Sequence, residues 1–174
     1  MYRAICKYIK DYLPKVITVE PIQSGYLGDY PNIDLRIPAI LLEPKTDRRS
    51  PSSNVWNNGD YLIKLWVMVP IDRSYEESMD RAEDLLAAAD DQWSDMMGEG
   101  LLEPALPNGL YSALNGLKKL DEFASLSGSF GGVQWRVRDT VLNYNNTTFS
   151  VSQRASQRIN ITQIDLTIHL KIRV

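Results

Sequence analysis

An aspartate, a glutamate and a lysine in the N-terminal third of the chain match the loose spacing of a metal-dependent nuclease core. Asp34 is followed by Glu43 and Lys45. In such cores two carboxylates hold Mg²⁺, and a lysine steadies the attacked phosphate. Spacings of this kind often arise by chance, and Pro44 would interrupt the strand that normally carries the glutamate and the lysine. The pattern therefore favours a strand end followed by a charged loop, with a nuclease as the alternative.

Other reaction classes have few residues to draw on. The chain has one cysteine, Cys6, and one histidine, His169. A structural zinc site needs several Cys or His ligands, and a Ser-His-Asp or Cys-His site could use only His169. We expect Cys6 to be a small apolar residue of a helix and His169 to face solvent from a strand. The glycine cluster Gly128–Gly132 lacks the lysine of a phosphate loop and predicts a flexible turn. No catalytic residue, metal or cofactor is predicted.

Composition predicts one ordinary folded domain over residues 1–174. Hydrophobic residues make up 44% and charged residues 24%, and the net charge of −3 is too small to indicate a nucleic-acid or membrane partner. No apolar run is long enough to cross a bilayer, and the N-terminus lacks a signal-peptide pattern. A lone cysteine excludes an intrachain disulfide and suits a reducing compartment.

The N-terminal quarter predicts a helix and then a strand. Apolar residues recur at helical spacing from Tyr2 to Leu13, and Pro14 should end the helix. Lys15–Ile22 alternates like a strand, and Ser24–Pro31 has the composition of a turn.

Two apolar strands, Ile37–Leu42 and Tyr61–Ile71, flank the polar segment Glu43–Asp60. Its prolines, serines and asparagines predict a long projecting loop, and loops of that length are usually functional or disordered. The strand Tyr61–Ile71 is apolar on both faces, with only Lys64 clearly polar. We therefore expect helices on one face and another element or subunit on the other.

A capped amphipathic helix is predicted from Ser74 to Met97. Glu77 stands three residues after Ser74, which is a capping-box spacing, and Gly98 and Gly100 should end the helix. Its acidic run could be imagined as a metal site, but most of the run falls on the solvated face opposite the apolar stripe.

The C-terminal half is less regular. A possible short helix (111–123), a flexible connection (125–132), a strand (133–141), a polar hairpin tip or arm (143–156) and a final alternating strand (164–174) follow in order. Ile159 and Ile161 have the opposite parity to Ile164, which predicts a bulge or bend between them. The fold class is thus α+β: a mostly antiparallel twisted sheet, with the N-terminal helix and the long amphipathic helix on one face.

Several residues have the composition of an interface. Apolar anchors and cations stand together in the predicted loop, and two arginines share a strand: Lys45, Arg48, Arg49, Val55 and Trp56, then Arg136 and Arg138. Interfaces favour aromatic and arginine side chains in this way. Because the chain is acidic overall, we expect these residues to contact a protein surface in preference to nucleic acid.

The element order, with the segments Ile37–Ile40 (IPAI) and Tyr61–Val69 (YLIKLWVMV), resembles the tail-terminator (neck or tail-completion) proteins of long-tailed bacteriophages. The resemblance covers most of the chain and is best up to about Met97. It implies a structural virion protein of the tail and neck, assembled in the host cytoplasm, that forms a ring, typically a hexamer. The ring would cap the tail tube and join it to the head connector, with possible passive contact with DNA in the lumen.

Three alternatives remain beside this one. A head-completion or adaptor protein of the same neck would also form a ring. A nuclease using Asp34, Glu43 and Lys45 belongs to a different class, and a monomeric binding module would leave the two-sided apolar strand unexplained.

Overall fold

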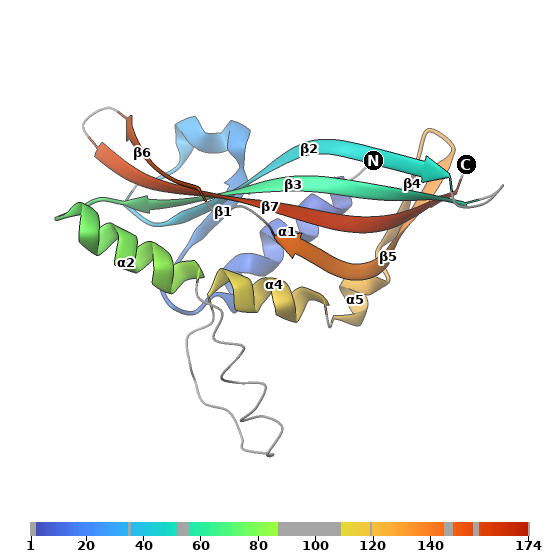
Figure 1. Cartoon of the computed structure of the whole chain (residues 1–174), viewed down its shortest axis with the longest axis horizontal. Coiled ribbons are helices and arrows are strands. Elements are labelled where there is room, and N and C mark those ends of the chain that lie inside the picture. Colours follow the sequence, from blue (N-terminus) through green and yellow to red (C-terminus); the bar gives the residue numbers. More distant parts are fainter. Residues whose placement is uncertain are drawn as a thin grey trace, which may run out of the picture.

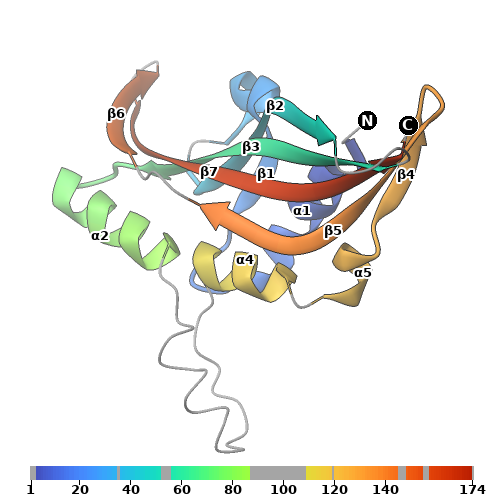
Figure 2. The ribbon, with the colours of Figure 1, turned by 45° about the vertical axis from the view of Figure 1, so that its right-hand side comes forward.

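The chain folds as an α+β protein with a curled, mixed sheet (Figures 1 and 2). The computed structural model describes residues 3–34, 36–51, 56–86, 109–118, 120–144, 148–154 and 157–173. Its elements are α1 (Arg3–Val16), β1 (Gln23–Tyr26), the 3-10 helix η1 (Leu27–Asn32), β2 (Ala39–Pro51), β3 (Trp56–Pro70), α2 (Tyr75–Leu86), α4 (Leu110–Lys118), α5 (Asp121–Ala124), β4 (Ser127–Phe130), β5 (Val133–Tyr144), β6 (Thr148–Arg154) and β7 (Gln157–Arg173).

The strands run in the order β1-β2-β3-β7-β5-β4, and β6 also pairs with β7. β1 and β2 are parallel, and the other pairs are antiparallel. β7 lies in the middle: one of its edges pairs with β3 from Trp56 to Pro70, and its other edge pairs with β5 and then with β6. This strand therefore joins the two halves of the sheet.

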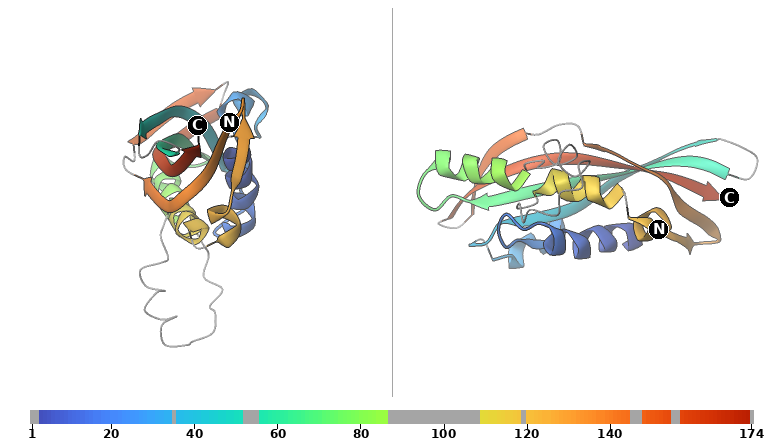
Figure 3. Two further views of the ribbon diagram at one scale, coloured as in Figure 1. Left: turned by 90° about the vertical axis from the view of Figure 1, so that its right-hand side faces the viewer. Right: turned by 90° about the horizontal axis from the view of Figure 1, so that it is seen from below.

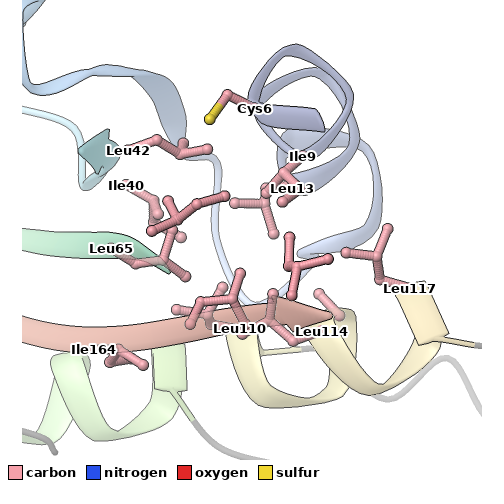
Figure 4. Close-up of a cluster of buried hydrophobic side chains, with 14 of the residues drawn as sticks. Cys6, Ile9, Leu13, Ile40, Leu42, Leu65, Leu110, Leu114, Leu117 and Ile164 are labelled. Atoms are coloured by element: carbon pink, nitrogen blue, oxygen red, sulfur yellow. The ribbon is translucent and has the colours of Figure 1, made fainter. Parts of the chain in front are cut away.

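Helices α1, α2 and α4 cover one face of the sheet, which we call the helix side (Figures 1 and 3). Alternate residues of the long strands point there because side chains of a strand alternate between faces. They form one core with the apolar stripes of the helices: from β3 Ile63, Leu65 and Val67, from β7 Ile164, Leu166, Ile168, Leu170 and Ile172, and from the helices Ile5, Ile9, Leu13, Leu85, Leu110 and Leu114 (Figure 4).

The opposite face, which we call the outer face, has a smaller apolar cluster at one end. Met68, Ile161 and Leu41 pack there against Leu27 and Tyr30 of η1. This cluster explains why β3 is apolar on both faces: an element of the same chain covers the second face at that end.

Of the bulge or bend predicted between Ile161 and Ile164, the bulge is wrong, and the bend stays a prediction. β3 and β7 stay in one unbroken register from Ile159 to Arg173. The parity of the apolar residues changes because Ile159 and Ile161 belong to the outer cluster, whereas Ile164 belongs to the helix-side core.

The predicted loop Glu43–Asp60 is also wrong over most of its length. β2 continues to Pro51 and β3 already begins at Trp56, so the two strands form a long hairpin. The register shifts between Pro44 and Thr46, which places Lys45 in a bulge. A bulge in a strand near the sheet edge is a setting that accepts proline.

Helix α1 does not end at Pro14, as the sequence predicted, but at Val16. A proline at position 14 cannot donate to the carbonyl of Lys10 four residues earlier. The hydroxyl of Ser24 donates to that carbonyl instead, at 2.5 Å. The missing hydrogen bond is thereby replaced, and the strand predicted at 15–22 gives way to the helix end and a connection to β1.

The predicted N-cap at Ser74 is present, since its hydroxyl accepts a hydrogen bond from the Glu77 amide at 3.1 Å. α2 follows from Tyr75 to Leu86, and the rest of the predicted helix, to Met97, lies outside the described residues.

Four short elements stand where the sequence predicted a possible short helix or open segments. α4 and α5 occupy the region of the possible short helix, and β6 pairs with β7 within the predicted arm. The expected flexible connection contains β4, which forms a tight hairpin with β5. Gly131 and Gly132 both have positive φ, 56° and 81°, as a two-residue type I′ turn requires.

Two polar side chains are buried on the helix side, at the end of the sheet where α2 packs. Asn160 and Thr162 are each 1% exposed, and they share the parity of the core residue Ile164. The amide of Asn160 and the hydroxyl of Thr162 have no hydrogen-bond partner among the described residues. Within the same residues, no helix is long and apolar enough to cross a membrane.

Replacing Gly128 by alanine should destabilise the protein by about 1–3 kcal/mol, because overpacking a filled site forces its neighbours to shift. A Cβ at this position would lie 2.7 Å from Cζ2 of the buried Trp135 side chain. Urea titration would measure the unfolding free energy. Gly28→Ala is the matched control, since its Cβ would meet nothing within 4 Å. Equal stability of the two variants would contradict this packing of Trp135.

Candidate interface surface

The middle of the outer face carries a half-buried polar network. Glu43 of β2 accepts hydrogen bonds from Lys45 Nζ at 2.5 Å and from Trp66 Nε1 at 2.8 Å. The ammonium of Lys64 lies 5.8 Å from the centre of the Trp66 ring and 3.9 Å from Oδ1 of Asp165. These contacts join β2, β3 and β7 on the face that the helices leave uncovered.

The electrostatics of the network centre on Glu43. Partial burial raises the pKa of this carboxyl, but the hydrogen bonds from Lys45 and Trp66 outweigh burial and hold the pKa below its usual range. The ionised carboxylate is therefore the form that the folded protein favours, and it holds the bulge at Lys45 against β3.

Cations gather at the end of the outer face where β7 ends. Arg136 of β5 stands directly opposite Lys171 of β7, and it also stands opposite Ser127 of β4. Directly opposed residues of antiparallel strands project to the same face, so these three side chains form a row. Arg173 stands opposite Gln134 on one side of this row, and on the other side Arg138 lies at a register shift of β5 and reaches Asn58 of β3. We call Arg136, Arg138, Lys171 and Arg173 the basic end.

The basic end borders a hollow of about 690 Å³. The residues that line it are Ala124, Ser125, Ser127, Arg136, Val137, Arg138 and Lys171. Three cations and two hydroxyls therefore stand among the described residues that line this space. Arg138 is steadied by a hydrogen bond from its guanidinium to Oδ1 of Asn58 at 3.2 Å. A negatively charged surface is the natural complement of such a hollow.

The lone cysteine and the lone histidine lie on opposite sides of the sheet. Cys6 is buried in the helix-side core, 3.1 Å from the hydroxyl of Tyr61, and burial raises the pKa of its thiol. His169 lies on the outer face, with its Nδ1 2.6 Å from Oδ1 of Asp60. The two side chains cannot form a Cys-His pair, because the sheet separates them.

The interface residues predicted from the sequence are spread along β2 and β3, from the middle of the sheet towards the end where β7 ends. Lys45 is exposed in the bulge, and the backbone of β2 places Arg48 and Arg49 opposite Asp60 and Gly59. Trp56 stands opposite Arg173 at the start of β3. Val55 lies outside the described residues.

The second predicted group, Arg136 and Arg138, is exposed on β5 and adjoins the same end through β7. Sequence reasoning missed Lys171 and Arg173. Both residues alternate with the buried Leu170 and Ile172 along the last strand. This alternation could have placed them on the exposed face from the sequence alone.

The three residues of the nuclease alternative have separate partners. Asp34 binds the guanidinium of Arg36 through two hydrogen bonds of 2.9 Å, whereas Glu43 binds Lys45 and Trp66. Among the described residues, no group of three or more His, Cys, Asp or Glu side chains could hold a metal ion together. The shared carboxylate pair that a nuclease core needs is thus not assembled by these residues.

In comparisons with known proteins, no family model and no curated protein sequence matches this chain.

Glu43→Gln should weaken folding at neutral pH by about 1 kcal/mol, because it removes the charge from two hydrogen bonds. The folded-state pKa of Glu43 is depressed, so its contribution is fully present above its unfolded pKa of about 4.3 and is lost as the pH falls through the folded value. The deficit of the variant, meaning its loss of unfolding free energy relative to the wild type, should therefore shrink below about pH 4.

Urea unfolding at a series of pH values would measure this deficit. Glu83→Gln is the control, because Glu83 is exposed on α2 and makes no ion pair with the described residues. A deficit that stays constant from pH 7 to about pH 3 would rule out a role for the Glu43 charge.

Proposed function

We propose that this chain is a ring-forming structural subunit of the tail-terminator class, at the head-proximal end of a phage tail. Six copies would form the ring, which caps the tail tube and gives the head connector a docking surface. The tube protein and the connector or adaptor protein are then its partners, and DNA passes the lumen with passive contact. In this role the protein acts by shape and surface complementarity, without chemistry.

The free edge of β2 is the observation that carries this proposal. β1 pairs only with Ala39–Leu42, and among the described residues no strand pairs with the same edge from Glu43 to Pro51. Unpaired main-chain groups along such an edge are a template for another chain. Figure 3 shows this part of the sheet extending past α1 and α5, so a partner can reach it.

The asymmetry of the two faces also supports an assembly role. Helices cover the helix side, whereas η1 covers the outer face only at the cluster around Met68 and Ile161. The remainder of the outer face carries the polar network of Glu43 and the basic end. The free edge of β2 adjoins the two segments that resemble tail terminators, Ile37–Ile40 and Tyr61–Val69, whereas the basic end lies outside them.

The ring itself is tested by negative-stain microscopy of the concentrated protein, with solution mass determined on the same sample. We expect closed rings with an open centre and a mass of about six subunits. The cognate tube protein, assembled into tubes, should bind these rings at one end. A chain that stays monomeric both alone and in the presence of tubes would overturn the proposal.

Arg48→Ala combined with Arg49→Ala should reduce tube capping at least about tenfold, since truncation of central interface arginines typically costs more than 1 kcal/mol. The measurement is the fraction of capped tubes at rising protein concentration. Lys7→Ala combined with Lys15→Ala removes the same charge from the exposed surface of α1 and should leave capping unchanged. Equal capping by both double variants would exclude the β2–β3 hairpin as the tube contact.

A further inference from the structure

Helix α2 presents an acidic surface at the end of the molecule opposite the basic end. Glu76, Asp80 and Glu83 recur at positions i, i+4 and i+7, so they form a stripe on one side of the helix, and all three are exposed. Glu77 and Asp84, also exposed, flank this stripe. We call these five carboxylates the acidic stripe.

The cation of α2 does not neutralise the stripe, because other carboxylates hold it. Arg81 donates three hydrogen bonds to Glu20, two of them at 2.9 Å, and lies 3.6 Å from Asp72. Within the described residues, Glu76, Asp80, Glu83 and Asp84 make no ion pair. The stripe is thus a concentrated negative surface facing solvent.

The two charged surfaces cannot meet within one molecule. Figure 1 shows α2 at one end of the longest axis, and β4 with the C-terminus at the other. The whole sheet lies between them. Complementary charge at opposite ends of one chain is suited to contact between successive copies.

The two surfaces are also of similar size. Seven residues of helix separate Glu76 from Glu83, which is about 10 Å along the axis. At the basic end, Arg136 and Arg138 are two residues apart on a strand, about 7 Å, and the neighbouring strand with Lys171 and Arg173 lies about 5 Å away. Long arginine and lysine side chains can span the remaining difference, and the hollow beside them leaves room for carboxylates.

We infer that the acidic stripe of one copy docks on the basic end of the next copy around the ring. This inference rests on the proposed function and names the surfaces that join its subunits. A contact between two different patches is heterologous, and repetition of it closes a ring when the rotation between copies allows. A second copy fits the basic end better than nucleic acid, because this same chain supplies the complementary surface and its net charge is −3.

Charge reversal tests the contact. The acid-reversed variant carries Glu76→Lys, Asp80→Lys and Glu83→Lys, and the base-reversed variant carries Arg136→Glu, Arg138→Glu and Lys171→Glu. Each variant alone has like charges on both surfaces. We expect each to need at least about tenfold more protein than the wild type to assemble, as judged by solution mass and microscopy.

Mixing the two variants in equal amounts should restore assembly, because each surface then meets its complement in alternate positions of an even-membered ring. This rescue also shows that both variants are folded, as does far-ultraviolet circular dichroism of each. The control carries Lys7→Glu, Lys10→Glu and Lys15→Glu, which is the same charge change on α1, and it should assemble like the wild type.

The outcomes separate this inference from the proposed function. If the wild type forms rings and both reversed variants form them equally well, the charge contact is wrong and the ring proposal stands. Loss of assembly without rescue on mixing also overturns the contact. If the base-reversed variant assembles normally but loses retention of a short DNA duplex, the basic end serves nucleic acid instead. A wild type that never assembles, even on tubes, overturns both.

Raising NaCl from about 0.05 M to about 0.5 M gives an independent measurement on the unmodified protein. Screening shortens the reach of exposed charges to a few ångströms at the higher salt, so the assembly midpoint should move to a higher concentration. An assembly midpoint that does not change with salt would contradict a contact made by these charges.

Discussion

β7 pairs with neighbouring strands on both of its edges, and this double pairing determines where the other strands lie. β3 follows one edge from Ile159 to Arg173 without a register shift, while β5 and β6 divide the other edge between them. Because strand side chains alternate, the register of this one strand also decides which residues face the helices. A shift of one residue would expose Ile164, Leu166 and Ile168 and bury their polar neighbours, Asp165 among them.

The same alternation gives the two faces of the sheet different compositions. On the helix side, an apolar stripe packs against α1, α2 and α4 and supplies most of the buried area. On the outer face, the buried apolar cluster lies at the end that η1 covers, and polar or charged residues occupy most of the remainder beside Leu62. Most of the buried apolar area of these strands therefore lies on one face, so exposed residues of β5 and β7 such as Arg136 and Arg173 can be exchanged without opening the core.

The features predicted correctly from the sequence depend on local pattern. The α+β class, the strands around Leu65 and Leu170 and the cap at Ser74 each have a signal within a few residues. The missed features depend on partners distant in the chain. β2 continues through Pro44 because β3 pairs with it, and α1 passes Pro14 because Ser24 supplies the missing donor. Of the basic end, only Arg136 and Arg138 were predicted, because Lys171 comes to lie beside Arg136 through the pairing of β5 with β7.

The end of the sheet under α2 and its centre differ in the free energy that local opening requires. At the α2 end, burial of the unpartnered polar atoms of Asn160 and Thr162 costs about 1–3 kcal/mol per group. That cost is recovered when water reaches them, so lifting this end needs less free energy than opening the centre, where Leu166 and Ile168 are fully buried. Amide hydrogens near Asn160 should accordingly exchange through local openings, whereas those near Ile168 exchange through global unfolding. β7 is thus graded in local stability, because its end under α2 should open at a lower free energy than its centre.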